Sequence, residues 1–316
     1  MRAMIYRAYG GPERLEMKDV PRPSPGAGQV LVRVIAGSVN PVDWKIASGQ
    51  LRLIMPITLP FIPGFDVSGD IVELGPGVSD FAIGDRVHAR IERNRGTGSC
   101  AEFAVVGVDV MAKAPAHLAA AEAAALPLAG LTALQGLRDR AGLRLEGTSE
   151  RVLVIGASGG VGHLAVQIAR AAGATVVAVC SARNAALVSS LGADDVIDYT
   201  KPRAYRGLAR FDIVLDCVGH SMFRWIGLLR GGGRFVSVLP GPDVFLRNIF
   251  NSLTGKKVRP VMLKSNAEDL RVLDHLVEAG KLRVVIDSRY PLSQLRAAWE
   301  RSMSRRTVGK IVIDVS

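Results

Sequence analysis

The first 118 residues form a series of short apolar and β-branched runs that are interrupted by glycine and proline. The runs predicted to be strands are 30–35, 66–74, 85–91 and 101–106, and residues 1–7 are expected to add a first strand. Short strands separated by turn residues are typical of a β-barrel-like domain. We therefore predict that the chain begins with a β-rich domain.

From residue 119 onward, helical periodicity alternates with apolar runs rich in β-branched residues. We predict helices over 119–137, 160–172, 184–191 and 222–229, and strands over 151–155, 175–180, 195–197, 211–217 and 234–238. This alternation indicates βαβ units and a parallel sheet. Two further helices, 266–279 and 292–303, and a closing strand, 310–315, follow. We expect the closing strand to return to the N-terminal domain.

Composition narrows the class of protein. Of the 316 residues, 48% are hydrophobic and 22% are charged, as in an ordinary globular protein rather than a disordered one. The longest apolar stretch, 123–134, is interrupted by Pro127 and is shorter than the about 20 residues that a membrane span needs. The first seven residues lack the apolar core of a signal peptide, so we expect a cytoplasmic protein without a membrane span.

Cysteine content and charge exclude some kinds of site. Cys100, Cys180 and Cys217 are far apart and form no Cys-x-x-Cys pair, which argues against a disulfide framework and a four-cysteine zinc site. The net charge is +11. Such a chain can bind nucleic acid or an anionic membrane, or it can present a solvated basic surface that attracts an anionic cofactor. We favour the last interpretation.

A glycine-rich loop carries the clearest chemical signal. The apolar run 152–155 leads into Gly156-Ala157-Ser158-Gly159-Gly160-Val161-Gly162 and then into a predicted helix. Glycine lets the backbone approach a pyrophosphate, and the helix N-terminus offers free N–H groups. Alanine replaces the first glycine of the dinucleotide fingerprint, but strand, turn and helix are in register. The predicted phosphate-binding residues are Ser158, Gly159, Gly160, Val161 and Gly162.

The end of the next strand indicates which dinucleotide is bound. NAD enzymes place a carboxylate there for the ribose 2′-hydroxyl. This chain has Ser181-Ala182-Arg183-Asn184 instead, a cation with hydroxyl and amide donors and no carboxylate. These groups suit a 2′-phosphate. We predict NADP(H) as the cofactor, while Arg183 as a plain surface arginine is the alternative.

Several segments together carry a family resemblance. They are Asn40-Pro41-Val42-Asp43-Trp44-Lys45, residues 63–69, Gly84-Asp85-Arg86-Val87, residues 128–133, the glycine loop, Leu191-Gly192-Ala193-Asp194 and Gly309-Lys310-Ile311-Val312. In order and spacing the chain resembles the medium-chain dehydrogenase/reductase superfamily. It is most similar to the branch of zinc-free quinone oxidoreductases and alkenal (enone) reductases, which includes chloroplast envelope quinone oxidoreductase homologues.

The resemblance implies an α/β fold with two domains. It implies a GroES-like β-rich catalytic domain over 1–118, a Rossmann doubly wound parallel-sheet domain that binds NADP(H) over 119–262, and a C-terminal segment over 263–316 that returns to the catalytic domain. It further implies a homodimer. The implied reaction is zinc-independent, NADPH-dependent reduction of a quinone or of the C=C bond of an α,β-unsaturated carbonyl by hydride transfer.

Zinc-dependent relatives differ from this chain at their metal ligands. They carry cysteine near the position of Asn40 and histidine in a Gly-His-Glu run, which here is Gly64-Phe65-Asp66. Without thiolate or imidazole ligands no tetrahedral zinc site is expected. Alcohol dehydrogenase chemistry, which uses zinc to polarise an alkoxide, is therefore not expected.

The resemblance also implies roles for individual residues. Ser181, Arg183 and Asn184 would bind the 2′-phosphate, Tyr199 would pack on the adenosine phosphate, and Thr132 would face the nicotinamide. Other residues would lie near the cofactor at strand ends or in the C-terminal segment; these are Val218, Gly219, Val238, Leu239, Gly309 and Lys310. Asn40, Asp43 and Lys45 would act near the reacting carbons. Asp43 as a residue that caps a helix and Lys45 as a surface lysine remain alternatives.

Two other functions remain open. An enoyl-thioester reductase would share the same fold and cofactor. Some relatives, the zeta-crystallin-like proteins, bind RNA, but the chain has no RNA-binding motif and only 5% aromatic residues, so a nucleic-acid partner is not expected. The segments 44–60 and near Phe245 are apolar, which indicates a hydrophobic small-molecule substrate.

Overall fold

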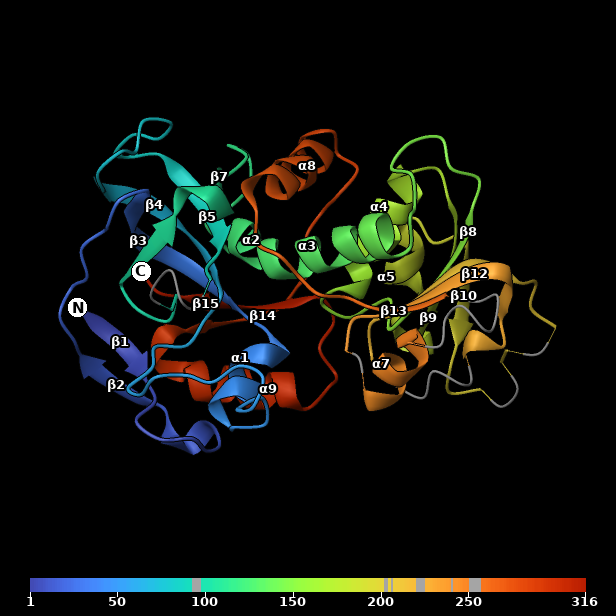
Figure 1. Cartoon of the computed structure of the whole chain (residues 1–316), viewed down its shortest axis with the longest axis horizontal. Helices are drawn as coiled ribbons and strands as arrows, with labels where there is room; N and C mark the ends of the chain where they lie inside the picture. The colour runs from blue at the N-terminus through green and yellow to red at the C-terminus, as the bar shows by residue number, and fades with distance from the viewer. Residues whose placement is uncertain (93–97, 202–203, 206, 220–224, 240, 250–256) are drawn as a thin grey trace. The chain divides into compact units, whose positions relative to one another are not determined.

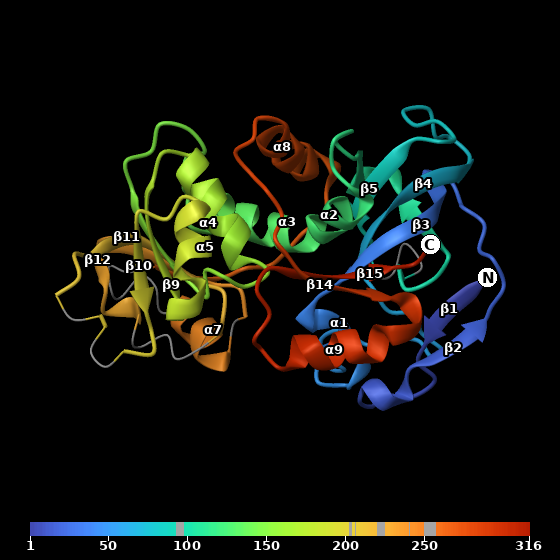
Figure 2. The ribbon, with the colours of Figure 1, turned by 180° about the vertical axis from the view of Figure 1, so that it is seen from behind.

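A computed structural model describes the chain over residues 1–92, 98–201, 204–205, 207–219, 225–239, 241–249 and 257–316. The chain forms two compact units. Unit 1 comprises residues 1–128, 265–274 and 284–316, and unit 2 comprises residues 129–264 and 275–283. Their elements are drawn in Figure 1 and from behind in Figure 2.

Unit 1 is built on a seven-stranded sheet. The strands run in the order β14 (Ile286–Pro291), β15 (Lys310–Asp314), β3 (Gln29–Val39), β4 (Asp66–Leu74), β5 (Arg86–Arg90) and β7 (Met111–Lys113), with β6 (Phe103–Gly107) also on β3. A hairpin of β1 (Arg2–Ile5) and β2 (Glu16–Asp19) lies apart from it. Alternate β-branched residues of β3, namely Val30, Val32 and Val34, enter the core, as the period of two requires.

The closing strand pairs with the N-terminal sheet. β15 runs antiparallel to β3, with Ile311 opposite Val39 and Asp314 opposite Ala36, and both views show the two strands side by side (Figures 1 and 2). A strand near the C-terminus of the chain therefore belongs to the same sheet as the strands of the N-terminal part, as predicted. Three helices also begin in unit 1. They are α1 (Pro41–Ala47), α8 (Ala267–Glu278) and α9 (Leu295–Met303).

The helix predicted over 119–137 is interrupted. It consists of α2 (Ala120–Ala125), α3 (Pro127–Gln135) and a π-helical turn over 136–140. Pro127 accounts for the break, because proline has no backbone N–H to continue the hydrogen bonds of the helix. The alanines of α2 pack closely on Ala36 and Val312, which places α2 in unit 1. The units consequently divide after Leu128, which differs from the predicted boundary at residue 118.

Unit 2 contains a six-stranded parallel sheet. Its order is β10 (Asp195–Asp198), β9 (Thr175–Cys180), β8 (Arg151–Ile155), β11 (Phe211–Asp216), β12 (Leu229–Ser237) and β13 (Lys257–Pro260). Helices α4 (Gly162–Ala171) and α5 (Ala185–Ser190) lie on one face and α7 (Pro242–Ile249) on the other (Figures 1 and 2). This arrangement confirms the predicted doubly wound Rossmann fold. Its topological switch point lies between β8 and β11, where ligands bind in such sheets.

One predicted helix of unit 2 is only partly described. The helix expected over 222–229 falls partly on residues 220–224, which lie outside the described residues. Its predicted end is wrong, because Leu229 already pairs with Phe211 as the first residue of β12. Among the described residues, no helix combines the length and the apolar character that a membrane crossing requires.

Candidate functional site

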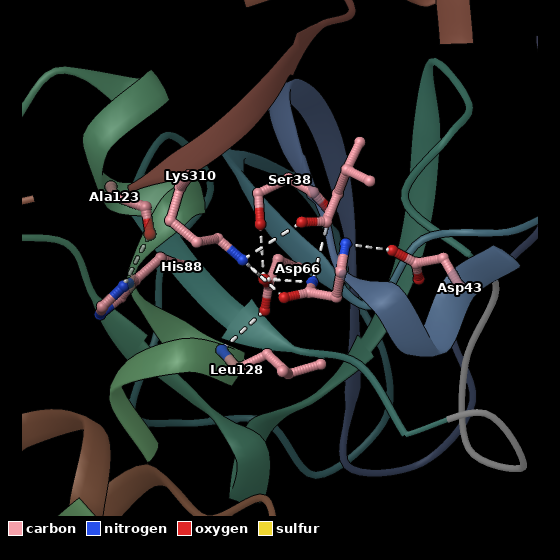
Figure 3. A network of polar contacts seen from close by, with 9 residues as sticks. Ser38, Asp43, Asp66, His88, Ala123, Leu128 and Lys310 are labelled. Atoms are coloured by element: carbon pink, nitrogen blue, oxygen red, sulfur yellow. Dashed lines mark hydrogen bonds and ion pairs between the residues drawn. The ribbon is translucent and has the colours of Figure 1, made fainter. Parts of the chain in front are cut away.

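A buried polar network gathers where β3 ends and α1 begins in unit 1 (Figure 3). Its centre is Asp66, the first residue of β4, which is fully buried. One carboxylate oxygen of Asp66, Oδ1, accepts the backbone N–H of Leu128 at 2.8 Å. Leu128 is the second residue of α3, so the carboxylate lies at a helix N-terminus, where negative charge is favoured.

The other oxygen, Oδ2, accepts three side-chain donors. Ser38 Oγ lies at 2.6 Å, Asn40 Nδ2 at 2.8 Å and Lys310 Nζ at 3.5 Å. Lys310 also donates to Asn40 Oδ1 at 2.5 Å. Lys310 and Asp66 thus form a buried ion pair whose remaining hydrogen-bonding capacity is met by neutral groups, which is the condition for burying charge.

Both ends of the Asn40 amide are engaged in this network. Its carbonyl oxygen accepts from Lys310, and its nitrogen donates to Asp66 and lies 3.5 Å from the Ser38 carbonyl oxygen. Asn40 is 2% exposed. The orientation of the amide is therefore fixed by the protein itself.

Asp43 closes the first turn of α1. Its Oδ2 accepts the backbone N–H of Asn40 at 2.6 Å, the backward bond of a capping box. Its Oδ1 is buried and has no hydrogen-bond partner within the described part of the chain. The pKa of Asp43 is raised to about 8. Burial is the largest cause and the nearby Asp66 adds to it, against the opposing effects of the Asn40 N–H, Lys310 and Arg90. Asp43 can therefore retain a proton on Oδ1 near neutral pH.

Lys45 lies apart from this network, although it is on the same short helix. Its Nζ lies 5.7 Å from the centre of the Trp44 ring. Half-burial lowers the pKa of Lys45, and the charge of Arg305 lowers it further. Within the described residues Lys45 has no carboxylate partner. The structure thus brings Asn40 and Asp43 together with Lys310. Lys45 lies outside this network, near the charge of Arg305.

A second buried contact holds helices to β5. His88 is fully buried, with Nδ1 at 3.2 Å from the Ala123 carbonyl oxygen and Nε2 at 3.1 Å from Asp274 Oδ1. Figure 3 shows the contact with Ala123 of α2, and the contact with Asp274 connects His88 to α8. We assign His88 a structural role.

In unit 2 the glycine loop presents a set of backbone donors. Within the described ranges, the N–H groups of Ser158, Gly160, Val161 and Gly162 donate to no protein acceptor. The loop itself is held by Val179, whose carbonyl accepts the N–H groups of Gly156 and Ala157, both at 3.0 Å. His163 adds support, since its Nδ1 lies 3.0 Å from the Gly159 carbonyl oxygen. A rigid loop with free N–H groups suits a pyrophosphate.

Two glycines are required by close packing at this sheet edge. A Cβ on Gly162 would lie 2.2 Å from the Gly156 carbonyl oxygen, so only glycine lets α4 start this close to β8. Gly219 has a φ of +76°, and a Cβ there would lie 2.8 Å from the Leu239 carbonyl oxygen. Asp216 Oδ1 holds this second turn by accepting the N–H groups of Val218 and Gly219 at 2.9 and 3.1 Å.

The turn after β9 presents the groups expected for a 2′-phosphate. Ser181 is half-buried, and Arg183 is exposed and forms no ion pair with a described carboxylate. Tyr199 follows β10, with its N–H 3.2 Å from the Cys180 carbonyl oxygen, so it lies at the same sheet edge. Asn184 differs from the others, because its amide donates to Ser158 Oγ at 2.9 Å.

The remaining predicted residues occupy three places. Thr132 is buried on α3, and Val238 and Leu239 follow β12, with Val238 N–H bonded to the Asp216 carbonyl. Gly309 has a φ of +80° and packs against Val285, ahead of Lys310 in unit 1.

Sequence reasoning missed Asp66 and Ser38 as members of the polar network. The available signal for Asp66 was its place at the start of the predicted strand 66–74, directly after Gly64-Phe65.

The side chains do not fit a zinc ion at the positions used by zinc-dependent relatives. The Asn40 amide is occupied by Lys310 and Asp66, and Phe65 is buried. No group of three or more histidine, cysteine or acidic residues in the described ranges is arranged to hold a metal ion. Burial also raises the pKa of all three thiols, Cys100, Cys180 and Cys217, which disfavours the thiolate that binds metal.

Known proteins resemble this chain over its whole length. The family described as alcohol dehydrogenase GroES-like domain matches residues 26–119, and the family described as zinc-binding dehydrogenase matches residues 191–313. The chloroplast envelope quinone oxidoreductase homolog of Arabidopsis thaliana is 42% identical, with 99% of this chain and 98% of that protein covered. The NADPH-dependent alkenal/one oxidoreductase of the same plant is 33% identical, with coverage of 99% and 79%.

A solved structure also resembles this chain over its whole length. The quinone oxidoreductase from Coxiella burnetii superposes with a TM-score of 0.89 at 32% identity, over 100% of this chain and 99% of that one. The GroES-like match confirms the predicted class of the β-rich domain. The chain belongs to the medium-chain dehydrogenase/reductase superfamily, in its branch of quinone oxidoreductases and alkenal reductases.

Proposed function

We propose that the protein is an NADPH-dependent oxidoreductase that reduces quinones or the C=C bond of α,β-unsaturated carbonyl compounds. The relatives named above carry these activities in their names. The observation that supports it most is in unit 2. Within the described residues, a glycine loop with N–H groups that have no protein acceptor is followed, at the end of the neighbouring strand, by Ser181 and by Arg183, which has no carboxylate partner; the turn itself holds no carboxylate.

The cofactor would be held by groups of three kinds. The free N–H groups of the glycine loop and the N-terminus of α4 would bind the pyrophosphate. Ser181 and Arg183 would bind the 2′-phosphate, with Tyr199 beside the adenosine. Bound NADPH supplies the hydride that reduces the substrate. The residues of the chain orient the reactants and stabilise charge.

On the substrate side we assign different tasks to three residues. Lys45 is a half-buried cation without a carboxylate partner in the described chain, so it is available to stabilise negative charge on a carbonyl oxygen. Asn40 positions the end of β3, because its amide is already engaged. Asp43 holds a proton on Oδ1 near neutral pH and keeps the buried network from gaining a second negative charge.

A substrate screen tests the proposed function. Purified protein is mixed with NADPH and, in separate reactions, with quinones, enones, alkenals and crotonyl thioesters, and NADPH oxidation is followed by absorbance. We expect turnover with quinones or enones. Turnover with thioesters alone would assign the protein as an enoyl-thioester reductase, and no oxidation with any class would contradict the proposal.

We also propose a homodimer, a cytoplasmic location and a hydrophobic small-molecule substrate. The dimer is supported by the resemblance to the family and is tested by light scattering coupled to gel filtration. The location is supported by the sequence alone, while two of the relatives are named for chloroplasts. Fractionation of the source cells with an antibody against the protein tests it.

A further inference from the structure

The side chains of Asn184 and Ser158 form a hydrogen bond between two loops. Asn184 Nδ2 donates to Ser158 Oγ at 2.9 Å, and 26 residues separate them in the chain. Ser158 belongs to the glycine loop after β8, and Asn184 ends the turn after β9. Because β8 and β9 are parallel neighbours, both loops lie at the same edge of the sheet.

The position of Asn184 makes this bond unusual. Asn184 occupies the N-cap of α5, where an asparagine side chain commonly accepts a helix N–H. Here the side chain forms no such bond with the helix. The backbone N–H of Asn184 donates to the Ser181 carbonyl at 2.9 Å, which fixes the turn. The amide of Asn184 is consequently bonded to the glycine loop, and it does not cap the N-terminus of α5.

The bond determines which way the serine hydroxyl can donate. A hydroxyl has one proton and two acceptor lone pairs. Since Asn184 donates into one lone pair, the Ser158 proton must be directed to another acceptor, and the described residues supply none. The neighbouring N–H groups of Gly160, Val161 and Gly162 are also without protein acceptors. The hydroxyl therefore joins a set of donors that converge on an anion.

We propose that Asn184 is a positioning residue for the pyrophosphate rather than a ligand of the 2′-phosphate. It orients the Ser158 hydroxyl as a donor to the pyrophosphate, which NADPH and NADH have in common. Arg183, one residue earlier, is the residue that distinguishes the two cofactors. This inference rests on the proposed NADPH-binding function, and it replaces the role in 2′-phosphate binding that the family resemblance implied for Asn184.

Asn184→Ser is the main test variant. Serine retains the ability to cap α5 but is too short to reach Ser158, so folding is preserved while the bond is lost. We expect NADPH and NADH to be weakened by the same factor, about 2- to 12-fold, as for a neutral hydrogen bond. Adenosine 2′-phosphate, which has no pyrophosphate, should bind as it does to the unmodified protein. The Kd values are measured by calorimetry or by nucleotide fluorescence.

Two companion variants complete the design. Arg183→Ala should weaken NADPH and adenosine 2′-phosphate and leave NADH nearly unchanged. Ser158→Ala should weaken both dinucleotides by roughly 10- to 150-fold, because it removes a bond to a charged group. In the Ser158→Ala background, Asn184→Ser should have no further effect, since the two residues act through one hydroxyl.

Three results would overturn the inference. One is a loss confined to NADPH and adenosine 2′-phosphate in Asn184→Ser, which would make Asn184 a ligand of the 2′-phosphate. The others are unchanged binding of both dinucleotides in that variant, and additive losses in the double variant. Failure of the unmodified protein to bind either dinucleotide would instead contradict the proposed function.

Discussion

The ammonium group of Lys310 lies 2.5 Å from Oδ1 of Asn40, although 270 residues separate them in the chain. The family resemblance implied that Lys310 approaches the cofactor. In the structure its side chain is directed into unit 1, where Asp66 and Asn40 surround it. Burial lowers the pKa of Lys310, and Asp66 and Asp43 oppose that shift. The contacts with Asp66 and Asn40 therefore favour the ammonium form of Lys310 against the effect of burial.

Replacing Lys310 by methionine should destabilise the protein. Lys310→Met keeps the length of the side chain but leaves the Asp66 carboxylate without its cation and Asn40 Oδ1 without a donor. Loss of one partner of a buried pair costs about 3–5 kcal/mol. Urea unfolding followed by circular dichroism measures the loss.

Lys113→Met is the matched control. Lys113 is 58% exposed and pairs with Asp85 at 2.9 Å, and an exposed pair contributes less than about 1 kcal/mol. A loss in Lys310→Met no larger than in this control would mean that the buried lysine is not charged in the folded protein.

Asp43 should make stability depend on pH. Its pKa is raised from an ordinary 3.8 to about 8 by burial, so between these values the folded protein holds a proton that the unfolded chain has released. The free energy of unfolding contributed by Asp43 therefore falls as pH rises through this window, by at most about 1.4 kcal/mol per pH unit.

Asp43→Asn removes that dependence while preserving an acceptor for the Asn40 N–H. We expect the free energy of unfolding of the variant, relative to the unmodified protein, to increase steadily from pH 4 to pH 8. Thermal or urea unfolding at several pH values gives this difference. A difference that does not change with pH would show that Asp43 is ionised in the folded protein throughout the range.

Elements whose pattern is local were predictable from the sequence. The strand 66–74 was predicted with the bounds that the structure gives it, since it ends at a Gly-Pro-Gly turn. The glycine loop was likewise recognisable, because strand, turn and helix follow one another. By contrast, α1 has only seven residues, too few to show helical periodicity, and it was missed.

The composition of the polar network was not predictable, because it depends on the pairing of distant strands. Lys310 reaches Asn40 only because β15 pairs with β3, and Asp66 reaches both because β4 pairs with β3 on its other side. Proximity in sequence was also misleading. Asn40 and Lys45 belong to one motif, yet the amide faces the network and the ammonium group faces Trp44.

The protein should prefer NADPH over NADH. The turn 181–184 offers the Arg183 guanidinium and no carboxylate to the ribose. Arg183→Ala should weaken NADPH roughly 10- to 150-fold, the range for hydrogen bonds to a charged group, with little change for NADH. Equal binding of both dinucleotides by the unmodified protein would refute this preference.

Activity should not require a metal ion. Asn40 and Phe65 stand where zinc-dependent relatives have cysteine and histidine, and neither side chain can replace those ligands. Elemental analysis of purified protein should find less than one zinc per chain, and incubation with a chelator should leave NADPH oxidation unchanged. A zinc-dependent alcohol dehydrogenase treated in parallel is the control. Stoichiometric zinc together with chelator-sensitive activity would contradict the prediction.

Lys45 should act on the substrate and not on the cofactor. It is half-buried, lies beside Arg305 and has no carboxylate partner in the described residues, so its charge is available to a carbonyl oxygen that becomes negative. Loss of one such group typically lowers turnover by ~10²–10³. Lys45→Ala should therefore lower the single-turnover rate of hydride transfer by about that factor, with NADPH affinity changed by less than about tenfold.

The same variant distinguishes the alternatives. If Lys45 contacts the cofactor, Lys45→Ala will lose much of its NADPH affinity and react at a near-normal rate once NADPH is saturating. If Lys45 is a surface lysine, neither quantity will change. Lys18→Ala is the control, because Lys18 is an exposed lysine that already pairs with Glu16 at 3.4 Å. Stopped-flow measurement of the rate and titration of NADPH binding in both variants decide among the three roles, because each role predicts a different pair of results.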